Sequence, residues 1–111
     1  MKVLITGLSG FIEGYLKTRL EPKHEIFDLE CDLRDYNAVK SRLQDVNPDF
    51  IIHLAARTEV EKSFYEQITF SEVNYVGTVN LVESARDLPN LKLFVFSSTM
   101  ETYGWQPESD L

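Results

Sequence analysis

The chain has 111 residues, of which 43% are hydrophobic and 26% are charged, and its formal net charge is −7. This length suits one domain with a buried core, and the acidic balance argues against nucleic acid or an anionic membrane as a partner, because both attract basic surfaces. The single cysteine, Cys31, excludes an internal disulfide and favours a reducing, cytoplasmic location. We expect neither a signal peptide nor a membrane span, since the apolar runs are only a few residues long.

Strand-like and helix-like segments alternate along the chain. Val3–Ile5 is an apolar strand, and a helix follows over Phe11–Leu20, in which Ile12, Leu16 and Leu20 form a stripe that faces the core. The other predicted elements are strands over His24–Leu29, Phe50–Leu54 and Leu91–Phe96, a helix over Tyr36–Val46 with Asp35 as its N-cap, and a long helix that starts at about Phe64 or later and ends at Asp87. From the two later helices, the residues expected to face the core are Val39, Leu43, Val46, Val73, Val76, Leu81 and Ala85.

A glycine-containing turn, Thr6–Ile12, follows the first strand directly. A turn of this kind between a buried strand and a helix offers backbone N–H groups and a positive helix end to a dinucleotide pyrophosphate. Gly7 and Gly10 allow a tight turn and close approach of the backbone to phosphate, and Phe11 and Ile12 open the helix. The alternative is an ordinary strand–helix turn without a ligand.

Glu13 stands where the pattern Gly-x-x-Gly-x-x-Gly has its third glycine. Positions 13, 16 and 20 share one helix face and Gly14 points away from it, so no residue has been inserted. A carboxylate there either prevents close packing or lies near the ligand's phosphates, and a buried unpaired charge costs several kcal/mol. The gain from the helix dipole, about 0.3–1 kcal/mol, is smaller. We predict weakened cofactor binding, or none.

Asp28 ends the second strand, about 20 residues after the glycine turn, where a carboxylate accepts hydrogen bonds from the adenosine ribose. Leu29 and Glu30 follow it, and neither would attract a 2′-phosphate, so NAD is expected rather than NADP. The alternative is a solvated acid at a strand end.

The alternation of strands and helices predicts an α/β fold with a Rossmann-like open parallel sheet, strand order 3-2-1-4 and helices on both faces. We expect residues 1–111 to be a single, partial dinucleotide-binding domain that is truncated after the fourth strand, with the substrate domain absent. Ligands bind such sheets where the strand order reverses, here between the first and fourth strands. The loop after the first strand should therefore face Ser97–Thr99 across one crevice.

Five blocks stand in order along the chain: Thr6–Ile12, Cys31–Asp35, Pro48–Ala56, Asn74–Leu81 and Phe94–Gly104. They are similar to the TGxxGFI turn, the D-[LI]-R-D segment, the PDxVIHLAA strand, the NxxGTxNLL helix and the FVFSS[ST]xxxYG segment of the extended short-chain dehydrogenases/reductases, the NAD-dependent nucleotide-sugar epimerases and dehydratases. The chain thus resembles the N-terminal part of that family.

The resemblance implies roles for several residues. Asp32 and Leu33 would flank the adenine, and Leu54, Ala55 and Ala56 would lie along the cofactor. Thr99 matches the catalytic Ser/Thr that hydrogen-bonds the sugar hydroxyl or ketone, and Glu101 matches an acid that helps to eliminate water in 4,6-dehydratases. The alternatives are core packing for the apolar residues and a solvent-facing loop acid for Glu101.

The family's catalytic Tyr-x-x-x-Lys follows a fifth strand, and the chain stops before that point. Tyr36 and Lys40 have the spacing but lie on the helix after the second strand, so we interpret this match as a coincidence. Without that tyrosine, no group takes the hydroxyl proton as hydride leaves. The prediction is the NAD-binding portion of a nucleotide-sugar epimerase or 4,6-dehydratase-like protein, without turnover as this chain alone. The alternatives are a non-catalytic nucleotide-binding module and a degenerate structural or interaction domain.

The expected partners follow from the same reading. A nucleotide sugar would be the substrate of the full-length family, and no metal is expected, since His24 and His53 form no ligand cluster. Phe94–Phe96 would form an apolar, unpaired sheet edge, because a full family member pairs a fifth strand there. We therefore expect self-association through the edge of the fourth strand.

Overall fold

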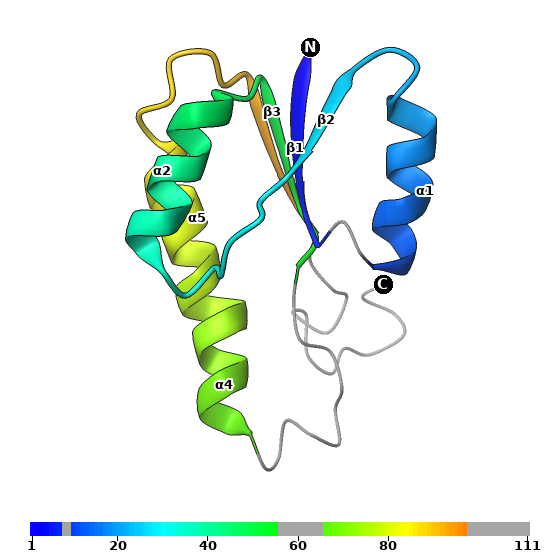
Figure 1. Cartoon of the computed structure of the whole chain (residues 1–111). Coiled ribbons are helices and arrows are strands. Elements are labelled where there is room, and N and C mark those ends of the chain that lie inside the picture. Colours follow the sequence, from blue (N-terminus) through cyan, green and yellow to red (C-terminus); the bar gives the residue numbers. More distant parts are fainter. Residues whose placement is uncertain (8–9, 56–65, 98–111) are drawn as a thin grey trace, which may run out of the picture.

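Four parallel strands form the centre of the computed structural model, which describes residues 1–7, 10–55 and 66–97 (Figure 1). The strands are β1 (Lys2–Thr6), β2 (Glu25–Asp28), β3 (Phe50–His53) and β4 (Leu93–Phe96). Each begins or ends within two residues of its prediction. The α/β class and the open parallel sheet are confirmed.

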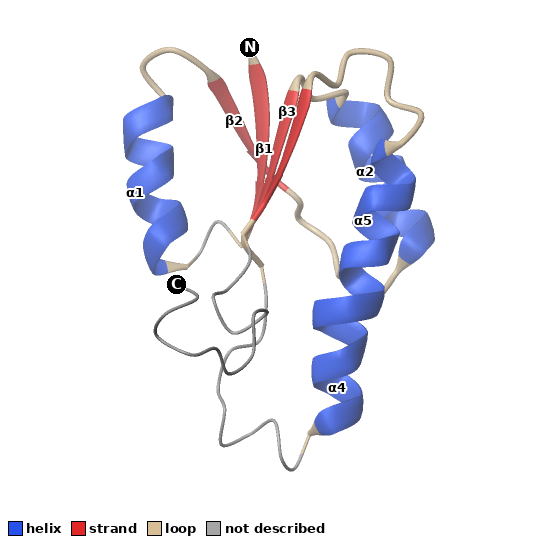
Figure 2. Cartoon of the chain, turned by 180° about the vertical axis from the view of Figure 1, so that it is seen from behind, coloured by secondary structure: helices blue, strands red, loops and turns tan. Residues whose placement is uncertain are grey.

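The helices lie on both faces of this sheet, as predicted. Helix α1 (Phe11–Leu20) covers one face, whereas α2 (Tyr36–Val46) and α5 (Gly77–Ala85) pack together on the other, which Figures 1 and 2 show from opposite sides. A short helix, α4 (Gln67–Ser71), and a π-helical turn, Glu72–Val76, lead directly into α5. No helix in the described ranges has both the length and the apolar character to span a bilayer.

The predicted strand order is wrong. The order is β2-β1-β3-β4, so the third strand of the chain pairs with β1, on the side away from β2. The crossover through α2 carries the chain from β2 back past β1, so the strand Phe50–His53 joins the sheet beside β1 and not beyond β2. The order therefore reverses between β1 and β3. Right-handed crossovers in opposite directions place α1 on one face and α2 with α5 on the other.

The main core lies between the sheet and the pair α2 and α5. Helix α2 has the predicted bounds, and the Asp35 carboxylate caps it by accepting a hydrogen bond of 3.1 Å from the backbone N–H of Ala38. Asn47, in the left-handed region (φ 48°), ends it. The buried residues of this core are Leu4, Leu29, Leu33, Val39, Leu43, Val46, Ile51, Leu81 and Ala85.

Helix α1 differs from its prediction in the face that it turns inward. Ile12 is exposed (60%), whereas Glu13 is buried (8% exposed), and Leu16 and Leu20 are half-buried. The inward face therefore runs through positions 13, 16 and 20, which lie on one side of a helix. The expected place of Ile12 in the core stripe is wrong, and the inward direction of Glu13 is confirmed.

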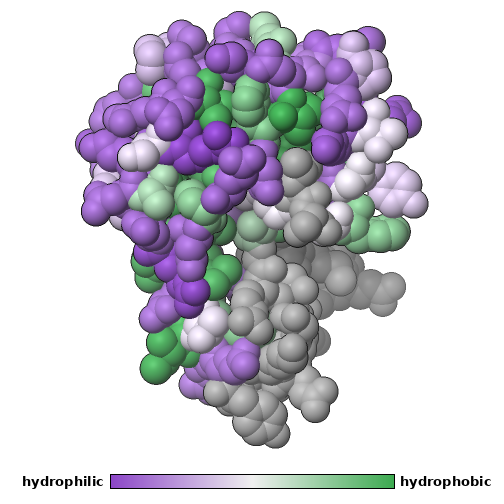
Figure 3. Space-filling model, in the orientation of Figure 1, coloured by the Kyte–Doolittle hydropathy of each residue, from purple (hydrophilic) through white to green (hydrophobic). Residues whose placement is uncertain are grey.

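The helical segment from Gln67 to Ala85 is only partly as predicted. Leu81 and Ala85 are buried and Val73 is half-buried, but Val76 is exposed. The π-helical turn at Glu72–Val76 adds to the residues per turn and so shifts the phase of the faces before and after it. The exposed apolar side chains of this segment are Ile68, Tyr75, Val76, Val79 and Val82. Green spheres mark apolar residues at the lower left of Figure 3, where α4 lies in Figure 1.

Candidate functional site

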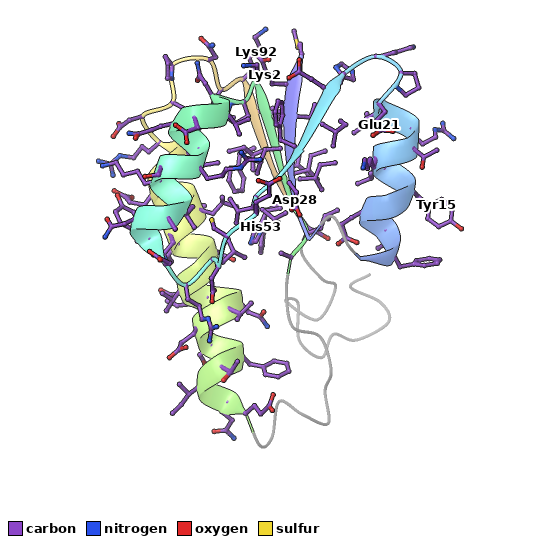
Figure 4. The ribbon with its side chains drawn as sticks, in the orientation of Figure 1. Lys2, Tyr15, Glu21, Asp28, His53 and Lys92 are labelled. Atoms are coloured by element: carbon purple, nitrogen blue, oxygen red, sulfur yellow. The ribbon has the colours of Figure 1, made fainter. Side chains whose placement is uncertain are left out.

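A cavity of about 500 Å³ opens at the carboxyl ends of β1, β2 and β3. This is the end of the sheet where ligands of open α/β folds bind, beside the reversal of strand order. Asp28 and His53 lie near this end and Lys2 and Lys92 near the opposite one (Figure 4). The cavity is lined by Thr6, Gly7, Asp28, Leu29, Glu30, Cys31, Asp32, Leu33, Ala55 and Val73.

Gly7 shapes the part of the cavity that follows β1. Its φ of 77° is left-handed, and a Cβ added to it would lie 3.1 Å from the Cα of Ala55. The carbonyl of Gly7 accepts a hydrogen bond of 2.8 Å from the backbone N–H of Gly10. A glycine is thus required both by the backbone conformation and by the approach of β1 to the end of β3. Residues 8 and 9 of the turn lie outside the described residues.

The N-terminus of α1 has an acidic side chain of its own. Gly10 is the N-cap, with an extended backbone and no side-chain cap. The Glu13 carboxylate lies against it so closely that a Cβ at Gly10 would collide with Oε2. Phe11 and Ile12 are exposed, and the Phe11 ring packs edge-on against Tyr15. A buried carboxylate therefore stands at the helix end where backbone amides attract an anion.

Asp28 ends β2 at the cavity, and its Oδ1 accepts a hydrogen bond of 2.8 Å from the backbone N–H of Leu29. Glu30, two residues on, has a left-handed backbone (φ 61°) and also lines the cavity. The Arg42 guanidinium donates to the carbonyl oxygen of Asp28 at 2.9 Å and pairs with Glu30 at 3.4 Å. This arginine is not among the lining residues, so two acidic side chains line this part of the cavity and the cation is held outside it.

The connection after β2 is fixed against α5. Asn80 Nδ2 donates to the carbonyl of Leu33 at 2.8 Å, and a Cβ at Gly77 would lie only 2.9 Å from the Cβ of Leu33. The Asp32 carboxylate accepts hydrogen bonds from the Arg34 side chain and backbone, which lower its pKa to about 2. Leu33 thus belongs to the core as well as to the cavity lining, and Asp32 is already bonded within its own segment.

A polar network around the buried side chains of Thr6 and His53 lies at the end of β3 and was not predicted from the sequence. His53 is only 2% exposed; its Nδ1 lies 2.7 Å from Thr6 Oγ1 and its Nε2 lies 2.8 Å from Thr78 Oγ1. The backbone N–H groups of Leu54 and Ala55 both donate to Thr6 Oγ1 at 3.0 Å. Polar residues in apolar strands, Thr6 at the end of β1 and His53 at the end of β3, were the available signal, because buried polar groups need partners.

The expected site residues are thus only partly brought together. Gly7, Asp28, Asp32, Leu33 and Ala55 line one cavity, while Phe11 and Ile12 are exposed beside Gly10. Ala56, Thr99 and Glu101 lie outside the described residues. The expected crevice between the first and fourth strands is wrong, because β3 lies between β1 and β4. The backbone N–H of Ser97 donates a hydrogen bond to the carbonyl of His53. Tyr36 and Lys40 do not line the cavity.

Comparisons with known proteins show which family this chain belongs to. The family model described as GDP-mannose 4,6 dehydratase matches residues 15–111. A GDP-6-deoxy-D-talose 4-dehydrogenase from Aggregatibacter actinomycetemcomitans is 42% identical over 96% of the chain, and a dTDP-D-glucose 4,6-dehydratase from Dictyostelium discoideum is 32% identical over 93% of it. The chain spans 38% and 30% of the lengths of these two relatives.

Solved structures give the same assignment. The UDP-glucose 4-epimerase of Thermus thermophilus, solved in complex with NAD, is 28% identical and superposes with a TM-score of 0.76 over 84% of this chain and 36% of its own. Other similar structures contain NAD, NADP or NADPH, and the family uses NAD(P). The chain belongs to the extended short-chain dehydrogenases/reductases, the family of NAD-dependent nucleotide-sugar epimerases and dehydratases.

Proposed function

We propose that this chain is the NAD-binding part of a nucleotide-sugar epimerase or 4,6-dehydratase-like protein, and that it does not turn over substrate alone. The observation that supports this most is the cavity at the reversal of strand order. Gly7 at the end of β1 and Asp28 at the end of β2 both line it. A full-length protein of this kind would take a nucleotide sugar as substrate. We further propose a cytoplasmic location, which the single cysteine favours.

The residues present fit one NAD molecule at most points. Gly7 lines the cavity in a left-handed turn whose backbone can approach a phosphate, and Asp28 offers a carboxylate to the adenosine ribose hydroxyls. NAD, when bound, supplies a hydride acceptor that later returns the hydride. In this proposal Gly10, Phe11 and Ile12 present amides to the pyrophosphate, Asp32 and Leu33 flank the adenine, Leu54, Ala55 and Ala56 follow the cofactor, and Thr99 and Glu101 act on the sugar in the longer protein.

NAD rather than NADP is the proposed cofactor. Asp28 and Glu30 line the cavity, and the negative charge of Asp28 would repel a 2′-phosphate. Arg42, the cation that such a phosphate would need, is held by Glu30 and by the carbonyl of Asp28. The chain should therefore bind NADP more weakly than NAD.

Isothermal titration of the 111-residue chain with NAD, NADP and ADP-ribose tests the proposal. We expect micromolar binding of NAD, with NADP at least about tenfold weaker. ADP-ribose should bind almost as well as NAD, because the residues named above contact mainly that half. Silence with all three ligands up to millimolar concentration would contradict the proposal. Turnover of a nucleotide sugar by this chain alone would contradict its second part.

A second candidate function is supported by Glu13. Its buried carboxylate stands at the N-terminus of α1, where it opposes a diphosphate. A chain with this residue could be a degenerate domain that serves structure or interaction, or a module that binds a nucleotide without chemistry. The titration separates these two, because only the module binds NAD or ADP-ribose.

We also propose self-association through the outer edge of β4. This strand is last in the sheet, and Leu93, Val95 and Phe96 are exposed on it. An unpaired edge with apolar side chains favours pairing with a second copy.

A further inference from the structure

A series of hydrogen bonds, centred on the buried pair Thr6 and His53, connects β1, β3 and α5 beside the cavity. It starts at the N–H groups of Leu54 and Ala55, passes through the Thr6 hydroxyl and the His53 ring, and continues to Thr78. The Thr78 hydroxyl then donates to the carbonyl of Asn74 at 2.8 Å, within the π-helical turn. His53 lies at the lower end of the sheet, on the side of α5, in Figure 4.

The hydroxyl groups of Thr6 and Thr78 lie on opposite sides of the His53 ring, and each of them fixes the protonation of one ring nitrogen. Thr6 Oγ1 accepts two N–H groups, which occupy its lone pairs, so its proton is donated to Nδ1 of His53. Thr78 Oγ1 donates its proton to a carbonyl, so it accepts from Nε2 of His53. Two independent arguments thus require a neutral ring with its proton on Nε2.

We infer that His53, as the neutral Nε2–H tautomer, is a positioning residue that holds the turn Leu54–Ala55 against the end of β1 and thereby shapes the cavity. Ala55 lines the cavity, and its backbone is the group that Gly7 approaches most closely. A rotated Thr6 hydroxyl would release both amides of the turn at once. The importance of this for a ligand rests on the proposed function, whereas the hydrogen bonds themselves do not.

The surroundings of His53 favour the neutral ring. Hydrogen bonds and ring contacts join the imidazole to Thr6, Phe94, Phe96 and Thr78, from β1, β4 and α5, and none of these four carries a charge. The Phe96 ring stacks on the imidazole with 5.7 Å between centroids. Burial lowers the pKa of His53. An imidazolium would direct an N–H at Thr6 Oγ1, whose lone pairs are already used.

The tautomer is tested on the unmodified 111-residue chain by ¹⁵N-detected NMR of the two histidine rings at about pH 7.5, where an unperturbed histidine is mostly neutral. For His53 we expect a protonated Nε2 and a bare Nδ1, and a protected Thr6 hydroxyl proton. His24 provides a second histidine signal in the same spectrum. An Nδ1–H tautomer or an imidazolium at His53 would overturn the inference, whatever the chain binds.

Two isosteric variants test the positioning role. In His53→Asn the amide lies near the place of Nδ1 and can still accept from Thr6, whereas in His53→Gln it lies near the place of Nε2 and keeps only the bond to Thr78. We expect hydrogen exchange at Leu54 and Ala55 to rise at least about tenfold in His53→Gln and clearly less in His53→Asn. Equal exchange in both variants, or the reverse order, would contradict the role.

Thr6 provides a matched pair for the same measurement. Thr6→Val keeps the shape and removes the hydroxyl, while Thr6→Ser keeps the hydroxyl, so only Thr6→Val should expose the two amides to exchange. NAD affinity is measured on the same variants, and we expect a roughly tenfold loss in Thr6→Val and His53→Gln. If the unmodified chain binds no NAD, the proposed function fails while the exchange and tautomer data still decide the role of His53.

Discussion

Glu13 is the residue that we expect to affect cofactor binding most in this chain. It faces inward with Leu16 and Leu20, is buried, and lies against Gly10 at the helix end that would receive the diphosphate. A carboxylate and a phosphate several ångströms apart repel each other by about 1–3 kcal/mol in a surface-like environment. We therefore expect Glu13 to lower the affinity of the chain for a diphosphate.

Removal of this charge should increase NAD affinity. We expect Glu13→Gln to bind NAD roughly tenfold to a hundredfold more tightly than the unmodified chain, because the repulsion disappears while the side-chain volume stays. Glu13→Gly removes the volume as well and should bind at least as tightly, although glycine within a helix costs about 1 kcal/mol of stability. Calorimetric titration measures both.

Glu21 offers the control for Glu13. It is exposed at the other end of α1, where it pairs with Lys17 at 3.6 Å. Glu21→Gln changes the net charge equally and should leave NAD affinity unchanged. An affinity gain of the same size in both variants would show that net charge acts, and not the position of Glu13.

His53 gives the fold a dependence on pH whose sign is fixed. The pKa of His53 is lowered in the folded chain, whereas in the unfolded chain it stays near its ordinary value of about 6.5. Below that pH the unfolded state takes up a proton that the folded state does not, so the free energy of unfolding falls as the pH decreases. Above about pH 7.5 both states are neutral at this residue, and its contribution is constant.

Urea unfolding between about pH 5 and 8 checks this dependence. The variant His53→Asn has no titrating group at this position, so its free energy of unfolding should decrease less steeply below about pH 6.5 than that of the unmodified chain. Identical slopes for the two proteins would mean that His53 does not titrate differently in the folded and unfolded states.

Alanine substitutions at the two helical glycines Gly77 and Gly14 should change the stability of the chain in opposite directions. A Cβ at Gly77 would lie 2.9 Å from the Cβ of Leu33, whereas a Cβ at Gly14 meets nothing within 4 Å. Gly77→Ala should therefore destabilise the chain by about 1–3 kcal/mol, since α5 must move away from the connection after β2. Gly14→Ala should stabilise it by about 0.5–1 kcal/mol through helix propensity alone.

Thermal and urea unfolding of the two alanine variants measure this difference. The same substitution in two helices separates the packing effect from the propensity effect. If Gly77→Ala were as stable as the unmodified chain, the close contact between α5 and Leu33 would not be a constraint on the fold.

The elements were predictable where local patterns and packing agree. Helix α2 has a cap, an apolar stripe and a left-handed residue at its end, and all three signals are in its own sequence. In α1, Ile12 suggested the wrong face, because packing against the sheet turns positions 13, 16 and 20 inward and leaves Ile12 exposed. The π-helical turn before α5 has no recognised local signal, so the phase shift that exposes Val76 could not be derived.

The candidate site was predictable to the extent that it follows strand ends. Gly7, Asp28 and Ala55 come directly after or at the end of strands, and parallel strands bring their carboxyl ends together. The network of His53 depends on Thr78, 25 residues away, which only the packing of α5 brings to the ring. Such a pairing has no periodicity in the sequence.

For the whole molecule, the order of the strands decides where the site lies. Because β3 pairs with β1, Gly7 at the end of β1 lies against Ala55 at the end of β3. In the order expected from the sequence, the second strand is next to the third, and these two residues would not be neighbours. The prediction placed the third strand, Phe50–Leu54, beyond β2, whereas the chain crosses back past β1 through α2 and this strand pairs with β1. Right-handed crossovers allow either direction along the sheet, so the alternation of strands and helices alone did not decide the order.

The sheet is covered unevenly, which bears on association between chains. On the face of α1, the residues Val3 and Ile5 of β1 are buried, whereas Leu93 and Val95 of β4, in register with β3, are exposed. An apolar cavity of about 240 Å³ lies on this face between Leu20 of α1 and β4. In the described part of the chain, β4 therefore has both an open edge and an open apolar face.

The exposed edge and face of β4 should let two copies of the chain associate. We expect the 111-residue chain to associate as its concentration rises, because edge pairing and burial of Leu93 and Val95 act together. Val95→Lys should keep the chain monomeric at concentrations where the unmodified chain associates, since a buried lysine would lack a partner. Val82→Lys, on the similarly exposed surface of α5, adds the same charge and should not prevent association. Sedimentation velocity distinguishes the cases, and an unmodified chain that stays monomeric up to millimolar concentration, or equal effects of the two lysines, would rule out the edge of β4 as the contact.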